Sequence, residues 1–440
     1  MRTTVKSENV RTAIVLQGGG ALGAYECGVM EALYKARGED FKPEVITGIS
    51  IGAVNAAILA GAGIEALGEA WRRRFALLEA VPHSPYAYVP PVPVYGQFIP
   101  PGQLIPPILQ QYLAVQGAML AWLPPLLQSV LREVIPQYIQ QRLSALGDES
   151  MYLPNPEYLY AGPLASTFTD SFYSTTPLRE TLQEVVDLDK LNQYCQVAVT
   201  AVNVATGQLA HFGNAKSLAK SLEIKDGEES QFTNRDCLSI DHILASGSLP
   251  PGFPATWVDG SSYWDGGLFS NTPLSVAINC LERCCGDDSV EREVIVVELF
   301  SRVGSVPNSI PEVINRIFNL TFSSKLTLDT KLFQQINDYI ELANRIKEII
   351  LIFDKIDAAL KQDPGLKEIT LIIDDIIKNH KGYKELIEHK KINYFTLIPF
   401  TAGPGLANAS DFSKATIEAR IKAGNQEAVR QQIAEPKRVP

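Results

Sequence analysis

The sequence predicts an α/β fold in which helices flank a mostly parallel β-sheet. Two short apolar runs, at residues 12–16 and 44–47, are each followed by a turn and a helical pattern, at 24–35 and 51–60. Further apolar runs at 196–202 and 293–299 continue the series. Strands that alternate with helices pair in parallel and are covered on both faces, so this order indicates an α/β core.

Length and composition indicate a globular protein. The chain has 440 residues, of which 46% are hydrophobic, and 31 Gly and 28 Pro are near average usage, which excludes disordered and collagenous chains. A prior of roughly 150 residues per domain allows one large domain or two to three ordinary ones. The formal charge of −10 excludes a basic surface over the whole protein, so we expect no nucleic-acid partner.

Targeting signals and cysteine spacing favour a cytoplasmic protein. The first 20 residues contain no signal-peptide core, and no run of eighteen residues is apolar enough to predict a transmembrane helix. Six cysteines without a CxxC pair suit a reducing compartment. Cys280, Cys284 and Cys285 lack zinc-ligand spacing, so we expect a buried apolar role for them and no metal site.

Composition divides the chain into four segments. Residues 1–80 and 151–300 hold the two parts of the α/β core, and 301–440 form a helical C-terminal lobe with a return strand at 394–398 and a final helix at 411–423. Residues 81–150 form a proline-rich insertion or lid with a short helix at 108–123. Residues 80–131 carry no charged side chain. We expect such a segment to contact a membrane peripherally, or to pack against this protein or a second subunit. The two roles are compatible.

The first motif, GGGALG at residues 18–23, fits G-x-G-x-x-G between a strand and a helix. A dinucleotide site also requires an acidic residue at the end of the second strand, to hold a ribose. That strand ends instead in Gly48-Ile49-Ser50. The sequence therefore disfavours a nucleotide-dependent oxidoreductase, and we expect no cofactor.

The second motif, Gly48-Ile49-Ser50-Ile51-Gly52, is a G-x-S-x-G between a buried strand and a small-residue helix. A chance match is the alternative for the pattern alone, but this setting is typical of a nucleophile elbow, which would present the Ser50 hydroxyl to substrate. An oxyanion hole needs backbone donors beside such a serine. The amides of Gly18, Gly19 and Gly20, joined by the amide of Ile51, are the candidates.

A serine nucleophile also needs a base, and none of the five histidines lies in a recognisable triad motif. The better candidate is Asp265 in Trp264-Asp265-Gly266-Gly267, where the glycines permit another backbone to come close. Asp259-Gly260 is interpreted as a hairpin turn between strands at 255–258 and 263–264, so Asp265 should end the returning strand. We expect burial to raise the pKa of Asp265.

The motifs GGGALG, GISIG, ASGSLPPGFPATWVDGSSYWDGGLFSNTPL and SDFSKATIEARIKAG together resemble those of bacterial patatin-like phospholipases, over residues 11–80, 173–300 and 394–425. The resemblance implies a patatin-like fold and hydrolysis of lipid acyl esters by a Ser50–Asp265 dyad without histidine. Many members carry a basic residue at the fifth position of the glycine motif, where this chain has Leu22. The supporting glycines are Gly23, Gly48, Gly52, Gly266 and Gly267.

The sequence therefore predicts a serine lipid acyl hydrolase of the phospholipase A type that works through an acyl-enzyme on a lipid substrate. A lysophospholipase, a neutral-lipid esterase and a catalytically silent lipid-binding protein remain alternatives, and the oligomeric state is left open. Arg72, Arg73 and Arg74 are interpreted as a solvated helix face.

Overall fold

The structure is a computed structural model of the whole chain. It describes residues 9–38, 40–76, 92–94, 97–99, 150–155, 169–214, 230–232, 237–287, 289–301, 303–304, 306–308, 310–323, 326–354, 368, 371–372, 375, 379 and 389–439. The helix expected at 108–123, most of the insertion expected at 81–150, and His83 and His380 lie outside these residues.

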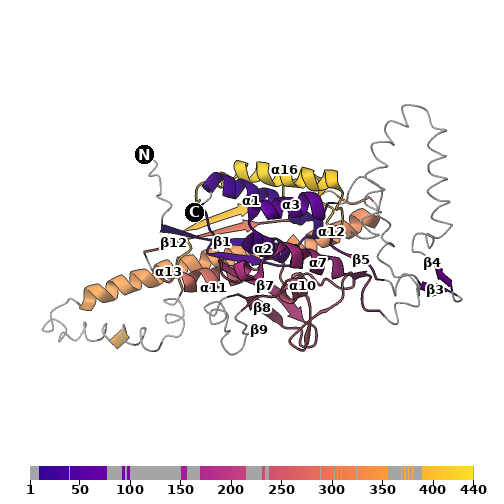
Figure 1. Cartoon of the computed structure of the whole chain (residues 1–440). Coiled ribbons are helices and arrows are strands. Elements are labelled where there is room, and N and C mark those ends of the chain that lie inside the picture. Colours follow the sequence, from indigo (N-terminus) through magenta and orange to yellow (C-terminus); the bar gives the residue numbers. More distant parts are fainter. Residues whose placement is uncertain are drawn as a thin grey trace.

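A nine-stranded sheet forms the centre of the described structure, with strands in the order β10-β11-β7-β2-β1-β12-β13 (Figure 1). Strands β7, β2, β1, β12 and β13 pair in parallel, whereas β11 and β8 pair with β7 in antiparallel orientation. The expected fold class, a mostly parallel sheet flanked by helices, is confirmed. The strands are β1 (Val10–Leu16), β2 (Val45–Gly48), β7 (Gln196–Asn203), β8 (Leu209–Gly213), β9 (Ser230–Phe232), β10 (Thr256–Val258), β11 (Ser261–Asp265), β12 (Glu291–Val297) and β13 (Tyr394–Ile398).

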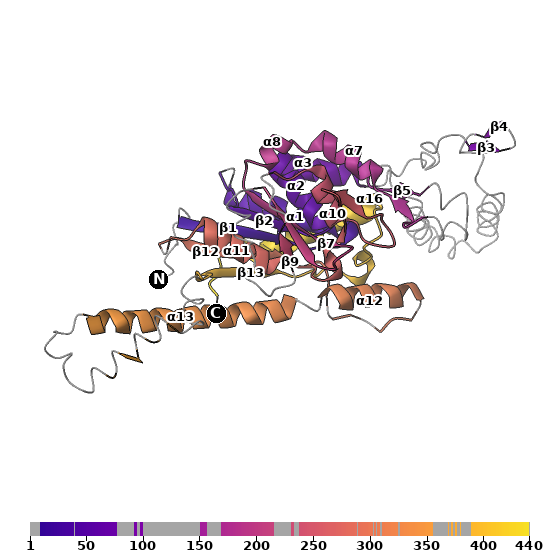
Figure 2. The same cartoon turned by 90° about the horizontal axis from the view of Figure 1, so that it is seen from below.

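Two apolar cores lie on opposite faces of this sheet. Alternation along β1 sends Ala13 and Val15 into one core and Ile14 and Leu16 into the other. Helix α11 (Leu274–Cys284) closes the first core, and α1 (Gly23–Arg37), α2 (Ile51–Ala62), α10 (Ile240–Ser246) and α16 (Lys414–Arg430) pack into the second. Figures 1 and 2 show α1 and α16 on one face and α11 on the other.

The remaining elements are short or peripheral. They are α3 (Ile64–Glu69), a π-helical turn η3 (Ala70–Arg74), α7 (Thr176–Val185), α8 (Leu188–Leu191), the 3₁₀ turns η2 (Gly20–Leu22), η6 (Gly266–Leu268) and η8 (Pro404–Leu406), and the two-stranded pairs β3 (Val92–Val94) with β4 (Gln97–Ile99) and β5 (Leu153–Pro154) with β6 (Tyr173–Ser174). The expected hairpin is confirmed: β10 and β11 are joined at Asp259 and Gly260, whose φ values of 54° and 78° match a type I′ turn.

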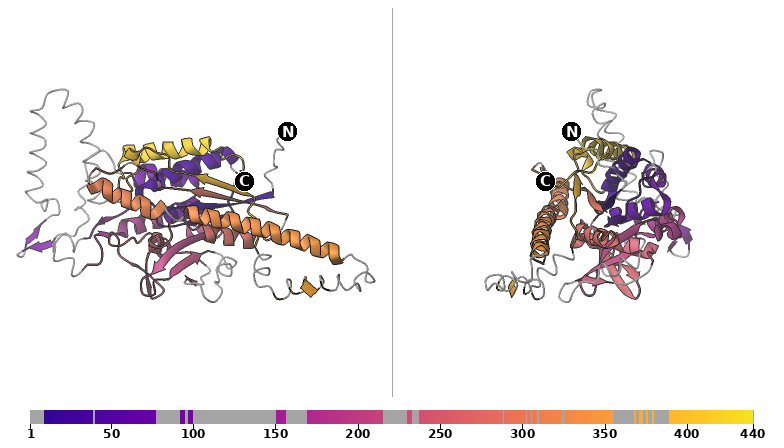
Figure 3. Two further views of the ribbon diagram at one scale, coloured as in Figure 1. Left: turned by 180° about the vertical axis from the view of Figure 1, so that it is seen from behind. Right: turned by 90° about the vertical axis from the view of Figure 1, so that its left-hand side faces the viewer.

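Two helices of the C-terminal part, α12 (Ile310–Ser323) and α13 (Leu326–Asp354), lie along one side of the core (Figure 3). The helical character expected after residue 300 is confirmed in α13, where Ile340 and Ala343 are buried. The side chain of Asn337 exchanges hydrogen bonds of 3.0 and 3.1 Å with the backbone of Ile392, just before β13. These bonds fasten the first half of α13 to the segment that leads into β13.

The return strand lies where it was expected, but the final helix was misplaced. Helix α16 begins at Lys414 rather than at residue 411 and continues to Arg430 rather than 423. The carboxylate of Asp411 accepts hydrogen bonds from the Ser413 amide and the Thr416 hydroxyl, both at 2.9 Å. Residues 411–413 therefore form a turn held by the Asp411 side chain instead of a first helical turn.

Candidate active site

The turn between β2 and α2 holds Ser50 in a conformation that few non-glycine residues adopt, with φ 56° and ψ −125°. Such a residue costs about 1–3 kcal/mol and persists only where its surroundings determine it. Here the Ser50 amide donates to the carbonyl of Ser246 at 3.0 Å, and the Ser246 hydroxyl donates to the Thr200 carbonyl at 2.7 Å. Helix α10 and strand β7 thus hold the turn in place.

Both glycines of the G-x-S-x-G motif are sterically required. A Cβ atom added at Gly52 would lie 2.5 Å from the Leu16 carbonyl oxygen, and one added at Gly48 would overlap the Gly52 carbonyl. Helix α2 can therefore begin directly against the ends of β1 and β2. This close approach is what projects Ser50 from the carboxyl edge of the sheet.

The glycine turn at the end of β1 lies beside Ser50. A Cβ atom at Gly18 would be 2.9 Å from Ser50 Cβ, and Gly20 takes a φ of 55°. The amides of Ala21 and Leu22 donate to Ala409 and Gly19 carbonyls. Within the described part of the chain, by contrast, the amides of Gly19, Gly20 and Ile51 donate to no protein acceptor, as expected of first-turn amides.

The two turns are tied together behind the site. The side-chain amide of Asn55 on α2 donates to the Gly23 carbonyl at 3.0 Å and to the Glu26 carboxylate at 2.8 Å, both on α1. A Cβ atom at Gly23 would lie 2.6 Å from the Ile51 side chain. Gly23 therefore permits the close contact of α1 with α2, which keeps the glycine turn next to the serine.

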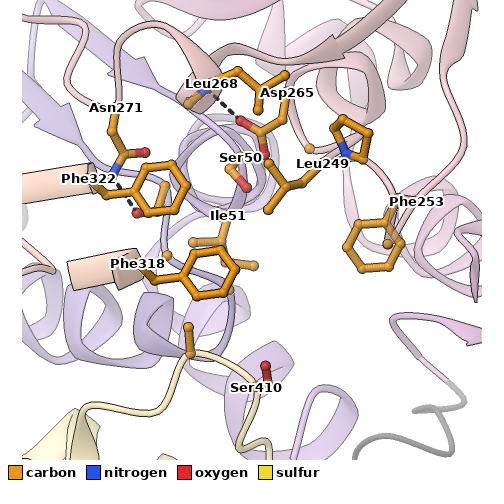
Figure 4. A pocket seen from close by; sticks show the side chains of 18 of the residues that line it. Ser50, Ile51, Leu249, Phe253, Asp265, Leu268, Asn271, Phe318, Phe322 and Ser410 are labelled. Carbon is orange, nitrogen blue, oxygen red and sulfur yellow. Dashed lines mark hydrogen bonds between the residues drawn. The ribbon is translucent and has the colours of Figure 1, made fainter. Parts of the chain in front are cut away.

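Asp265 ends β11, as expected, and is buried with 2% of its surface exposed. On β11, Asp265 pairs with Ala201 of β7, and on the other side of β7 Gly48 of β2 pairs with Val199. Ala201 and Val199 are two residues apart. The antiparallel strand β11 therefore brings the carboxylate to the same sheet edge as Ser50. Asp265 Oδ1 accepts a 2.7 Å hydrogen bond from the Gly267 amide (Figure 4).

The glycines after Asp265 each have a steric reason. A Cβ atom at Gly266 would overlap the backbone carbonyl of Thr200, so β7 approaches this turn as the sequence predicted. A Cβ atom at Gly267 would lie 3.0 Å from Asp265 Oδ1 and 3.1 Å from Asn271 Oδ1. Asn271 in turn donates to the Gly18 carbonyl at 3.0 Å, which links the aspartate turn to the glycine turn.

Burial raises the pKa of Asp265 from its ordinary value of 3.8 to about 6, although interactions with the Ser50 side chain and the Gly267 amide lower it. The direction agrees with the expectation from the sequence. A carboxylate with this pKa is ionised at neutral pH and is a stronger base than an exposed aspartate.

Ser50 and Asp265 open into a cavity of about 630 Å³, whose walls are mostly apolar. Figure 4 shows Ile51, Leu249, Phe253 and Leu268 around the serine, with Phe318 and Phe322 of α12 forming another wall. The amide turn of Gly18, Gly19 and Gly20 also lines it. A serine, a buried carboxylate and free backbone donors thus meet at the end of a space shaped for an apolar group.

Sequence reasoning missed one residue that supports this site. Arg420 on α16 is fully buried and donates to the carbonyls of Leu406 (2.9 Å), Asn408 (2.6 Å), Asp411 (2.6 Å) and Ala21 (3.2 Å). Three of these carbonyls belong to the 406–411 loop, whose Ala409 carbonyl accepts from the Ala21 amide at 2.8 Å. Arg420 lies within SDFSKATIEARIKAG, so that motif carried the only available signal.

The three described histidines make contacts elsewhere in the fold. His211 bonds the Thr200 hydroxyl at 2.9 Å, and burial lowers its pKa to about 4. His242 completes the cap of α10, and His389 lies 3.1 Å from Glu282. None of these three lines the cavity.

Other candidate groups also have structural explanations. Arg72, Arg73 and Arg74 pair with Glu31, Glu69 and Glu184, as expected of a solvated face, and Leu22 is buried in the core. Cys280 and Cys285 are buried in the core beneath α11, as expected, whereas Cys284 is only partly buried. Among the described residues, no group of histidine, cysteine or acidic side chains has a metal-binding arrangement, and no helix is long and apolar enough to cross a membrane.

Comparison with known proteins places this site within a family. The model of the patatin-like phospholipase family matches residues 14–278, more than half of the chain, and includes the glycine turn, Ser50 and Asp265. Among solved structures, the chain is similar to VipD from Legionella pneumophila, with 14% identity and a TM-score of 0.29 over 96% of this chain and 67% of VipD. No curated protein sequence matches the chain.

Proposed function

The chain belongs to the patatin-like phospholipase family, and from this premise we propose that it is a phospholipase A-type serine hydrolase with a Ser50–Asp265 dyad. The family supports lipid acyl hydrolysis in general. The observation that carries the finer proposal is the position of Ser50, in a strained turn, at the same sheet edge as the buried carboxylate of Asp265.

In the proposed mechanism, Asp265 accepts the Ser50 proton as the serine oxygen attacks the acyl carbonyl carbon. The carbonyl oxygen becomes an oxyanion that accepts hydrogen bonds from the amides of Gly19, Gly20 and Ile51, with Gly18 shaping the turn. The tetrahedral intermediate collapses, the lipid alcohol leaves with the proton held by Asp265, and an acyl-enzyme remains. Water then attacks the acyl-enzyme in the same way and releases the fatty acid.

Stabilisation of the oxyanion carries much of the proposed catalysis. Even with a pKa of about 6, Asp265 is a weak base for a serine hydroxyl. Loss of one oxyanion-hole donor typically costs about 10²–10³ in rate, which shows how much fixed amides contribute. The rigid glycine turn, braced by Asn55, Asn271 and Arg420, supplies such fixed donors here.

The apolar cavity favours an acyl chain as the bound group, but it suits phospholipid, lysophospholipid and neutral lipid alike. The proposal also includes peripheral membrane contact through residues 80–131 and the division of the chain into four segments. Most of the insertion lies outside the described residues. A catalytically silent lipid-binding protein is the alternative in a different class.

The test is fatty-acid release from phosphatidylcholine vesicles and hydrolysis of a short p-nitrophenyl ester. Wild type should act on at least one substrate, and Ser50→Ala and Asp265→Asn should each lose at least about 10³-fold in rate. Asp259→Asn is the matched control, because Asp259 lies in the exposed β10–β11 turn at φ 54°, which asparagine tolerates. It should retain full activity.

Reaction with a fluorophosphonate separates the hydrolase from a silent binder. Wild type should be labelled on Ser50, and Ser50→Ala should not. A folded wild type that is neither labelled nor active on either ester would overturn the dyad proposal. Activity on the short ester alone would instead favour an esterase or lysophospholipase over a phospholipase.

A further inference from the structure

We propose that five exposed aliphatic side chains around α12 dock the protein onto the surface of a zwitterionic lipid bilayer, next to the mouth of the active-site cavity. This α12 rim consists of Val303, Val306, Val313, Ile317 and Leu320. The inference rests on the proposed function, because it assumes that the cavity receives acyl chains.

Helix α12 is apolar on two sides. Phe318 and Phe322, four residues apart, line the cavity, and the rings of Phe322 and Phe300 are tilted by 35° with centroids 5.3 Å apart. Val313, Ile317 and Leu320 follow the spacing i, i+4, i+7 and are 38%, 57% and 47% exposed. A helix that is apolar on more than one face is ordinarily covered on each of them.

The chain just before α12 also exposes apolar side chains. Val303 and Val306 are 87% and 82% exposed, among the most exposed large apolar side chains of the described structure. Arg316 of α12 donates to the Ser301 carbonyl at 3.4 Å, and a Cβ atom at Gly304 would be 2.9 Å from its guanidinium. Ser301 and Gly304 therefore lie against α12, and Val303 lies between them in the chain.

The position of the rim identifies its occupant. Ile317 belongs both to the rim and to the lining of the cavity, so the apolar surface is continuous with the proposed acyl site. A lipid that enters from a bilayer docked on the rim would stay in contact with apolar side chains up to Ser50. If the rim faced only water, the acyl chain would have to cross water to reach the cavity, which is unfavourable for an apolar group.

Charge favours a neutral membrane surface. The chain carries a formal charge of −10, and α12 contains only two charged residues, Glu312 and Arg316. Because Arg316 is turned onto Ser301, the residues that the structure describes around the rim include no basic cluster for anionic lipid. Binding should therefore depend on apolar burial and respond little to salt, in contrast to a polybasic surface.

The test measures cosedimentation with phosphatidylcholine vesicles, in a Ser50→Ala background that prevents hydrolysis. Combined Val303→Ser, Val313→Ser and Leu320→Ser changes should lower the partition coefficient at least about tenfold, and raising NaCl from about 0.1 to 1 M should not weaken binding. None of these three side chains lines the cavity. Val429→Ser is the matched control, because Val429 is 65% exposed on α16, on a different side of the core (Figure 3).

A second measurement separates this inference from the proposed function. With Ser50 intact, the triple variant should hydrolyse a soluble p-nitrophenyl ester within about twofold of wild type yet lose fatty-acid release from vesicles. Equal vesicle binding by the triple variant and its parent would overturn the inference, even if the enzyme is active. The inference would also be overturned if the wild type bound no vesicles and formed a dimer, while the triple variant was a monomer. A second copy of the chain would then cover the rim. Failure of soluble-ester hydrolysis would count against the dyad and leave the vesicle result valid.

Discussion

Helices α12 and α16 both follow the segment that matches the family, residues 14–278. Helix α12 lines the cavity, and α16 braces the glycine turn through Arg420, yet the two helices place their side chains in opposite ways. Helix α16 buries charge: Arg420 is fully buried and Glu427 is 4% exposed. Helix α12 exposes apolar groups, including Ile317 and Leu320. Helix α16 can bury charged side chains because the surrounding groups form hydrogen bonds with them. The exposed apolar side chains of α12, by contrast, are not covered by the described core.

The buried charges of α16 are all matched. The guanidinium of Arg420 reaches four backbone carbonyls, and the carboxylate of Glu427 accepts from the Thr401 hydroxyl at 2.8 Å and from Arg430 at 2.7 and 2.8 Å. Close backbone approach adds to this, since a Cβ atom at Gly424 would overlap the Tyr25 carbonyl of α1. Helix α16 is therefore part of the α/β core, although the family model ends before it.

The largest expected effect comes from removing the donor set of Arg420. Arg420→Met keeps much of the volume but leaves buried carbonyls unpaired, so the free energy of unfolding should fall by about 3 kcal/mol or more in urea titrations. Because the 406–411 loop bonds the glycine turn through Ala409 and Ala21, kcat on a soluble ester should fall at least about tenfold with KM little changed. Arg73→Met is the control, since Arg73 pairs with Glu69 in solvent. An Arg420→Met protein with wild-type kcat would show that α16 only supports the fold.

Asp265 provides the next effect and a contrast with Arg420, because the structure offers its buried charge fewer donors. Its pKa is about 6 in the folded protein and near 3.8 when unfolded, so the folded state binds more protons between these values. The free energy of unfolding of wild type should fall by about 2–3 kcal/mol as pH rises from about 4 to above 6. Asp265→Asn should lack this slope and be more stable than wild type at pH 8.

The same pKa predicts the acidic limb of the activity profile. Since Asp265 must be ionised to accept the Ser50 proton, kcat/KM on a soluble ester should rise with pH and level off above about 6. Asp259→Asn, in the exposed turn, should leave this limb in place. A flat profile between pH 4 and 8 would contradict the role of Asp265 as a base.

Local patterns predicted most of the sheet and the positions of Ser50 and Asp265, because strands, turns and glycine requirements depend on neighbouring residues. The hairpin at Asp259-Gly260 is one case, and the elbow around Ser50 is another. Other features depend on distant partners. Arg420 bonds the Ala21 carbonyl 399 residues away, and a backbone carbonyl has no residue-type signature. The start of α16 was misplaced because the Asp411 side chain holds residues 411–413 in a turn before the helix. The spacing of α12 predicts an apolar face without showing what covers it.

The smallest expected effect concerns α12 and tests the comparison directly. Leu320→Ala removes a side chain that is already 47% exposed, so the free energy of unfolding should change by no more than about 0.5 kcal/mol. Ile421→Ala on α16 removes a side chain that is 4% exposed and should cost about 2–5 kcal/mol. Urea unfolding of both variants without lipid gives the two values.

Equal losses of unfolding free energy would mean that α12 is covered in solution, by another part of the chain or by a second copy. The rim would then not be exposed before the protein meets a membrane. Unequal losses, with phosphatidylcholine vesicles stabilising wild type but not the rim triple variant, would show that the cover of α12 is the lipid itself.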